Sequence, residues 1–219
     1  MMIASSRMYQ AFSIELLTEQ YVDEVASVVA KSFSNSSLVV AESDDMSDRE
    51  FRDYLAYVAL KCAKETSGLL ARCSETGQLI GSLLACDLAD TWGDKGFAYE
   101  AESDAMMSLL FTLNKAFFQD QSINKNEYMN FKFLAVSAEH GGKGIAAALV
   151  NEGVKMAAEK GFKFAHAEAT GAASQRVFIN KSGFDEKHEI DCCSFTFKGK
   201  TPFSSSVEGT TMKLVLKPL

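Results

Sequence analysis

The sequence predicts an α/β fold, built as a mixed central sheet of about seven strands with helices on both faces. Strand-like and helix-like runs interleave along the chain, and a glycine-rich turn past its middle joins a strand directly to a helix. The chain has 219 residues, of which 47% are hydrophobic and 23% charged, as is ordinary for a soluble globular protein. Because neither an internal repeat nor a linker is visible, residues 1–219 are expected to form a single domain.

Seven runs have the alternating or continuous apolar character of strands. The first alternates Phe12, Ile14 and Leu16. The second and third flank the turn Glu75-Thr76-Gly77 and are expected to form a hairpin. The predicted strands are residues 12–17, 69–73, 78–88, 130–137, 162–169, 185–195 and 210–216.

Five runs repeat apolar residues at helical spacing. Thr18 is placed to cap the first helix, and Ser47 the second, where Glu50 three residues on would complete a capping box. Gly161 and Gly183 stand where the last two helices are expected to stop. The predicted helices are residues 18–33, 47 to about 62, 103–118, 144–160 and 172–182.

Composition narrows the partners and the compartment. The net charge of −7 argues against non-specific nucleic-acid binding, and no run is long and apolar enough to span a bilayer. The five cysteines form no Cys-x-x-Cys pair, and no secretory leader is expected, so reduced thiols in the cytoplasm are predicted. The adjacent Cys192 and Cys193 are expected on a strand, with one thiol on each face. The three histidines lack ligand spacing, so no metal site is predicted.

The glycine-rich turn is the main functional signal. A strand containing Phe131 and Val136 leads to Gly141, Gly142 and Gly144, and a helix follows at once. Glycines permit close approach of the backbone, and the free N–H groups of a helix N-terminus attract an anion. A Walker loop would need Lys followed by Ser or Thr, and a Rossmann turn belongs to a first βαβ unit, so both fit poorly. The alternative is a plain strand–helix connection.

Three short motifs here resemble the GNAT superfamily of N-acetyltransferases. They are Leu134-Ala135-Val136, Gly142-Lys143-Gly144-Ile145-Ala146 and the closing Gly183-Phe184, and the element order matches over nearly the whole chain. The resemblance implies an acetyl-CoA-binding core at about 130–184 and a strand that splays from its neighbour to bond the pantetheine. The implied cofactor-binding residues are Leu134, Val136, Gly142, Lys143, Gly144, Ile145, Ala146 and Phe178. Lys143 either adds charge for phosphate or is a solvated loop lysine.

Within that superfamily the chain is similar to the arylalkylamine N-acetyltransferase-like branch, through the helix at 103–118 and the segment Phe33-Ser34-Asn35-Ser36-Ser37-Leu38. It departs from the pattern at three places. Gly141 stands where Arg or Gln is usual, and Ser36 stands near the position of a usual Glu base. The usual proton-donating Tyr falls on Ile179 when counted from Gly183-Phe184, and on Phe178 when counted from Ser174. Neither of these two side chains can donate a proton.

The candidate catalytic residues are Glu168, His166 and Ser174. Glu168 and His166 share one face of the strand at 162–169, while alanines occupy the other, so either could serve as the base. The alternative is a hydrogen-bonded pair that supports a helix. Ser174, with Thr170, matches hydroxyl positions that the resemblance implies, and helix capping is the alternative.

The expected function is an acetyl-CoA-dependent N-acetyltransferase, in which a primary amine of a small molecule attacks the thioester directly. Two alternatives remain: a protein or peptide N-acetyltransferase, and a CoA-binding domain without turnover. The expected partner is a small-molecule amine, with no nucleic acid and no membrane, and the protein is expected to be a monomer or homodimer.

Overall fold

The computed structural model describes residues 7–8, 11–34, 48–92, 101–102, 104–119, 121–204 and 209–219. These residues divide into two compact units. The first holds the described residues within Met1–Asn35, Met46–Cys86 and Phe131–Met156, and the second those within Asp87–Asn130 and Ala157–Leu219. The predicted cap Ser47 and most of the segment after Phe33 lie outside the described residues.

The seven predicted strands are all present, and a two-residue strand precedes them. In chain order they are β1 (Arg7–Met8), β2 (Phe12–Leu16), β3 (Gly68–Cys73), β4 (Leu79–Asp87), β5 (Tyr128–Val136), β6 (Phe164–Ala169), β7 (Asp185–Asp191) and β8 (Thr211–Pro218). The strand order is β1-β2-β3-β4-β5-β6-β8-β7. The β5–β6 pair is parallel, whereas β2–β3, β3–β4, β6–β8 and β7–β8 are antiparallel, so the predicted mixed α/β sheet is confirmed.

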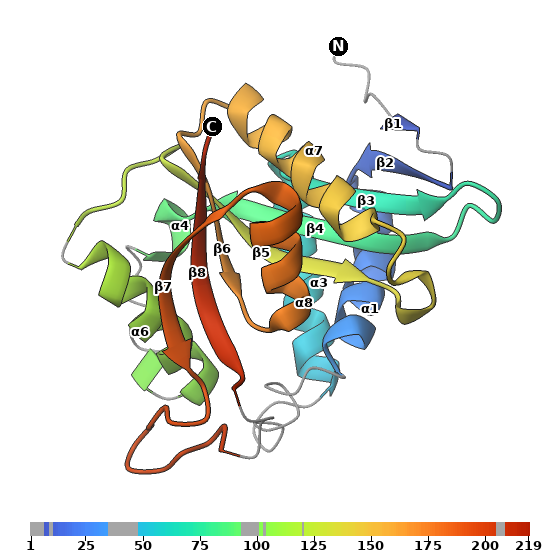
Figure 1. Ribbon diagram of the computed structural model, residues 1–219. Coiled ribbons are helices and arrows are strands. Elements are labelled where there is room, and N and C mark those ends of the chain that lie inside the picture. Colours follow the sequence, from blue (N-terminus) through green and yellow to red (C-terminus); the bar gives the residue numbers. More distant parts are fainter. Residues whose placement is uncertain are drawn as a thin grey trace. The chain divides into compact units, whose positions relative to one another are not determined.

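In the first unit, helices cover both faces of the strands (Figure 1). Helices α1 (Val22–Phe33) and α3 (Asp48–Lys64) pack against one face, where their apolar stripes meet Leu70, Leu84 and Ala135. Helix α7 (Ile145–Glu159) lies on the other face. A side chain at Gly153 of α7 would overlap Leu83 of β4, so glycine is what allows this helix to approach the strand closely.

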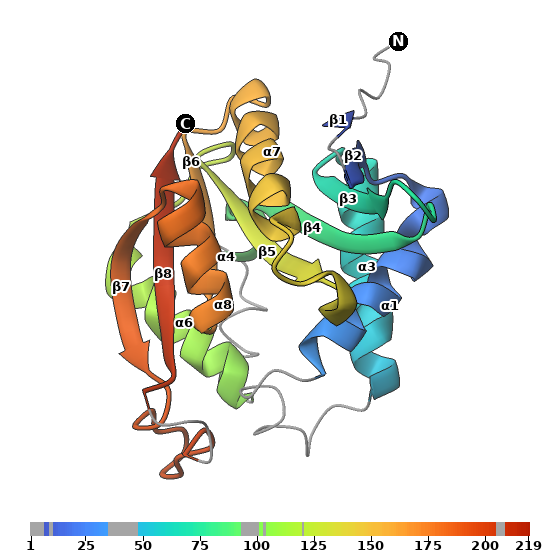
Figure 2. The same ribbon diagram turned by 45° about the vertical axis from the view of Figure 1, so that its right-hand side comes forward.

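In the second unit, Figure 2 shows α6 and α8 on opposite faces of β6 and β8. Helix α6 (Ala105–Phe118) begins at Asp104, whose carboxylate caps the amide of Met107 at 2.6 Å, and it follows the short helix α4 (Ala89–Trp92). Its buried residues face the β8 residues of the same core, namely Leu109, Leu113 and Phe118 against Met212, Leu214 and Leu216. Helix α8 (Ala172–Gln175) continues as π-helical turns, η3 (Arg176–Lys181).

Two sequence predictions about local structure are wrong. Thr18 stands at the N-cap position of a 3-10 turn (Glu19–Tyr21) that precedes α1, but its side chain makes no capping hydrogen bond. The pair Cys192–Cys193 lies in a turn rather than on a strand, since β7 ends at Asp191. The Asp191 carboxylate accepts the Cys193 amide at 3.1 Å, and this local bond competes with continuation of the ladder.

The contact between β4 and β5 gives a stability prediction. A Cβ at Gly81 would lie 2.9 Å from the Ala135 carbonyl oxygen and 3.3 Å from Cδ1 of Leu149. We expect Gly81→Ala to lower the free energy of unfolding by about 1–3 kcal/mol, because a buried backbone atom must move. Urea denaturation measures this change. Gly171→Ala is the matched control, since Gly171 is extended and a Cβ there meets nothing within 4 Å. Equal losses in both variants would contradict the prediction.

Candidate functional site

The turn after β5 is folded by its own hydrogen bonds. The Ser137 amide donates to the Ile80 carbonyl at 2.8 Å, and the His140 amide donates to the Ser137 carbonyl at 2.9 Å. The Ser137 hydroxyl also lies 2.9 Å from Nδ1 of His140, which fixes the imidazole ring. These contacts hold the 3-10 turn (Ala138–His140), so the glycines that follow start from a defined position.

The glycines then turn the chain into α7. Gly142 and Gly144 have φ values of +76° and +81°, a region that favours glycine. The Gly144 carbonyl accepts the Ala148 amide at 3.0 Å, the first bond of the helix. Across the described part of the chain, the amides of residues 142–147 meet no hydrogen-bond acceptor. They therefore point their N–H groups, and the positive end of the helix dipole, at open space.

This arrangement fits a phosphate group. Residues 142–144 are exposed, and a Cβ placed on Gly142 or Gly144 would meet nothing within 4 Å. Ile145 is buried and anchors the helix start, while Ala146 is partly exposed and too small to block the amides. Lys143 is also exposed, beside the same amides. The predicted anion site stays a prediction, and the free donors at this turn suit the phosphates of CoA.

Strand β5 pairs with β6 through three residue pairs of the second unit, from Tyr128–Phe164 to Asn130–His166. The splay predicted for this strand stays a prediction. Leu134 and Val136, both predicted to bind the cofactor, lie in the part of β5 that belongs to the first unit and are partly exposed. The Ser32 hydroxyl donates to the Val136 carbonyl at 3.5 Å.

Strand β5 is irregular, which the alternation of its sequence did not predict. Phe131 lies beside Gly153 of α7, whereas Phe133 packs edge-on against Phe33 of α1 with ring centroids 5.5 Å apart. Residues two apart share a face in a regular strand, so the strand changes phase between these two phenylalanines.

On β6, Glu168 and His166 share the face that packs against α6. The Glu168 Oε1 atom accepts a hydrogen bond from Nδ2 of Asn114 at 2.9 Å, and the His166 ring lies 5.9 Å from the Phe118 ring. His166 is 0% exposed, and its Nδ1 lies 3.3 Å from Oδ1 of Asn130, so Nδ1 carries the hydrogen. Glu168 is partly exposed. Of the two predicted bases, Glu168 is therefore the one that solvent reaches.

Burial lowers the pKa of His166, and the nearby Glu168 carboxylate only partly opposes this effect. The imidazole is therefore neutral in the folded protein, and its Nε2 has no hydrogen-bond partner. An unfolded chain would bind a proton there at its ordinary value of 6.5. Stability from this group is thus complete above about pH 6.5 and falls as the pH drops below it.

We expect the free energy of unfolding to fall by about 1 kcal/mol between pH 7.5 and pH 5.5 through His166 alone. Urea denaturation at both values measures the difference. His166→Gln should remove that share of the pH dependence, while His188→Gln, a change at a partly exposed position on β7, should retain it. If His166→Gln keeps the full difference, the imidazole is not neutral in the folded protein.

Ser174 and Phe178 lie on the segment after β6. The Ser174 hydroxyl donates to the Gly171 carbonyl at 2.9 Å and accepts from the Gly171 amide at 3.3 Å, so it serves the turn. Phe178 is 2% exposed and packs edge-on against Phe184 at 5.1 Å. The π-helical turns between Arg176 and Lys181 insert about one residue. That insertion accounts for the one-residue difference between Phe178 and Ile179 when the helix is counted from its two ends.

The sequence reading missed two buried amides, Asn114 and Asn130, which are 1% and 5% exposed. Both hold a predicted catalytic side chain. A signal for Asn114 existed, since it stands four residues from Leu110 and four from Phe118 on the apolar face of its helix. Buried polar residues on such a face need partners, and so they mark positions worth examining.

No group of three or more His, Cys, Asp or Glu side chains among the described residues could hold a metal ion. None of the helices in the described ranges combines the length and apolarity that crossing a membrane requires.

Comparison with known proteins gives a family and a fold. The model of the Acetyltransferase (GNAT) family matches residues 33–184, and no curated protein sequence matches this chain. The structure resembles arylalkylamine N-acetyltransferase 2 from Aedes aegypti with a TM-score of 0.77 and 20% identity, covering 94% of this chain and 98% of that one.

Two further solved structures share the fold. Drosophila melanogaster polyamine N-acetyltransferase has a TM-score of 0.77 and 10% identity, covering 95% of this chain and 100% of that one. The C-terminal condensation domain of Ebony, in complex with beta-alanyl-dopamine, has a TM-score of 0.78 and 13% identity, with 99% and 100% covered. At such identities the likeness establishes the fold.

Proposed function

The chain belongs to the GNAT family of acetyltransferases, and from that premise we propose that it transfers the acetyl group of acetyl-CoA to a primary amine of a small molecule. The observation that carries the proposal is the row of free amides at the start of α7, which matches an anionic cofactor. The proposal treats residues 1–219 as one acetyltransferase domain with its cofactor core at about 130–184.

The residues proposed to hold acetyl-CoA are those of β5 and the glycine turn. The amides of Gly142, Gly144, Ile145 and Ala146 bind the pyrophosphate, with Lys143 adding a positive charge. Backbone groups of β5 near Leu134 and Val136 bond the pantetheine. Phe178 is proposed as an apolar contact. These roles rest on the family resemblance together with the free donors at the start of α7.

Glu168 is proposed as the base. The acceptor arrives as an ammonium ion, and Glu168 takes one proton to give the neutral amine, whose nitrogen attacks the thioester carbonyl. The C–N bond forms, the C–S bond breaks, and the sulfur leaves with the electron pair. The nitrogen then loses a second proton while the thiolate gains one, so each turnover releases one net proton. Because thiolate is a good leaving group near neutral pH, a dedicated acid is not required.

The acceptor class is proposed from the names of the structural neighbours. Those names specify arylalkylamines and polyamines, both of which are small amines. We therefore propose a small primary amine, rather than a peptide amine, as the acceptor. None of the five cysteines, all of which lie in the described ranges, forms a disulfide, which agrees with the cytoplasm as the proposed location.

A second candidate is a CoA-binding domain without turnover. One observation favours it: where the family resemblance expects a proton-donating Tyr, the chain has Phe178 and Ile179, and Phe178 is buried against Phe184. Neither side chain can protonate a departing thiolate.

Two measurements test the proposal in order. Isothermal titration with acetyl-CoA should show binding, and its absence would refute the cofactor site. Thiol release is then followed with three matched amines: an arylalkylamine, a polyamine and a peptide with a free α-amine. Release with either small amine supports the proposal, and release with the peptide alone supports a peptide acetyltransferase. Binding without release for any amine supports the second candidate.

A further inference from the structure

Asn114 on α6 is a polar side chain in an apolar core. It is 1% exposed and lies among Leu109, Leu113 and Phe118. Asparagine is a poor helix former, and burial of an amide costs free energy unless every polar atom is bonded. In Asn114 the Oδ1 atom has no partner. Neither helix propensity nor apolar packing explains an amide at this position, so the explanation must lie in the hydrogen bonds that it makes.

The Nδ2 group of Asn114 makes two bonds. One hydrogen goes to the Leu110 carbonyl and the other to Oε1 of Glu168, both at 2.9 Å. These two acceptors settle the orientation of the amide, because the flipped form would set Oδ1 against two oxygens. The amide nitrogen is thus held by the helix on one side and holds the carboxylate on the other.

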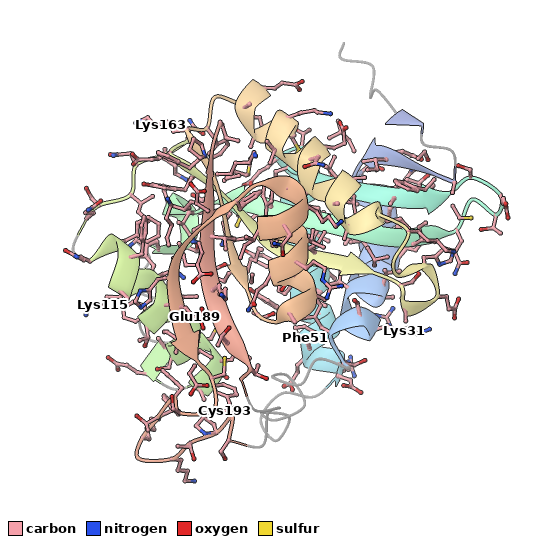
Figure 3. All side chains as sticks on the ribbon, viewed as in Figure 1. Lys31, Phe51, Lys115, Lys163, Glu189 and Cys193 are labelled. Carbon is pink, nitrogen blue, oxygen red and sulfur yellow. The ribbon has the colours of Figure 1, made fainter. Side chains whose placement is uncertain are left out.

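The other residues close to Glu168 do not hold its carboxylate, so the hydrogen bond from Asn114 is the main restraint on that side chain. On β6 the titratable neighbour is His166, which is buried and neutral. On β8 the paired residue is Leu214, which is apolar. On α6 the neighbouring Lys115 is exposed and lies at the outer side of the helix (Figure 3). In the described ranges, Asn114 is the only side chain with a hydrogen bond to Glu168.

We propose that Asn114 is a positioning residue for Glu168, a role that rests on the proposed acetyltransferase function. By bonding Oε1, it fixes the carboxylate plane and leaves Oε2 free to accept the proton of the acceptor ammonium. The orphaned Oδ1 is the cost of placing an amide donor at this point.

The test uses Asn114→Leu, which keeps the branched shape of the side chain and improves helix propensity. A structural role predicts loss of stability and little else. The positioning role predicts that kcat/KM for the amine falls about 10–100-fold while stability and the Kd for acetyl-CoA stay within about twofold. Thr112→Leu, at an exposed position on the same helix, is the control and should leave kcat/KM, stability and the Kd for acetyl-CoA unchanged.

A double variant separates the explanations. If Asn114 acts through Glu168, then Asn114→Leu combined with Glu168→Gln should be no slower than Glu168→Gln alone. If the losses in kcat/KM of the two single variants multiply in the double variant, the inference is overturned. A wild-type rate in Asn114→Leu would also overturn it. Should Asn114→Leu pack badly, Asn114→Ala supports the same comparison. An inactive wild-type protein refutes the proposed function and this inference with it, whereas an active wild type with an equally active Asn114→Leu refutes the inference alone.

Discussion

Gly144→Asp is expected to weaken the binding of CoA by on the order of 100-fold. The φ of Gly144 is +81°, a conformation that Asp and Asn adopt more readily than other L-residues, and nothing lies within 4 Å of the new Cβ. The change therefore places a negative charge before the free amides of α7 without a steric clash. A like charge about 5 Å from a phosphate costs about 3 kcal/mol at an effective dielectric constant of about 20, which is roughly two factors of ten.

Two variants isolate the charge in that experiment. Gly144→Asn has nearly the same shape without the charge, so its loss in affinity should stay below about tenfold. Gly161→Asp adds the same charge at the opposite end of α7, where φ is +82° and the space is also open, and it should leave the Kd unchanged. Isothermal titration measures all three. Raising the salt concentration should narrow the gap between the Asp and Asn variants at position 144. If Gly144→Asp and Gly144→Asn bind CoA with equal affinity, the phosphates of CoA do not bind at the start of α7.

The fold was predictable because its signals are local. Alternation and turn residues were enough to place seven strands, and glycines marked two helix ends, confirmed by φ values of +82° at Gly161 and +69° at Gly183. Strand ends were less predictable. The sequence of Cys192 and Cys193 resembles a strand. In the structure the Cys193 amide donates to the Asp191 carboxylate and the chain turns, and residue propensities do not report such local bonds.

The candidate site was predictable only in part, for the same physical reason. The glycine turn works through backbone amides, so its sequence signature is compact, and the family match ends at residue 184, where Gly183-Phe184 closes the motif. The groups around Glu168 come from α6 and β6, which are 54 positions apart at Asn114 and Glu168. Only the packing of the helix against the strand brings them together. The phase change in β5 between Phe131 and Phe133 is likewise set by packing on both faces of the strand.

Glu168→Gln is expected to lower kcat/KM for the amine by about 10²–10⁴-fold at pH 7, the usual contribution of a positioned base. Glutamine keeps the shape of the side chain, and its oxygen can still accept the 2.9 Å bond from Asn114. It cannot take a proton. Affinity for acetyl-CoA should change less than twofold, because the proposed phosphate site uses the amides of α7, and stability should change by less than about 0.5 kcal/mol.

The pH dependence then distinguishes a lost base from a damaged site. An alkyl ammonium has a pKa near 10, so each pH unit below that value lowers the free-amine fraction about tenfold. A variant without a base can use only this fraction, so its rate should rise about 100-fold between pH 7 and pH 9 and recover that much of the loss. A damaged site would stay slow at both values. Glu189→Gln on β7 removes an equal charge, since Lys213 lies 2.8 Å from Glu189 and lowers the pKa of that carboxyl, and it should leave the rate unchanged (Figure 3). Wild-type activity of Glu168→Gln at pH 7 would remove Glu168 as the base, and the proton would then have to leave the ammonium for water before the amine binds.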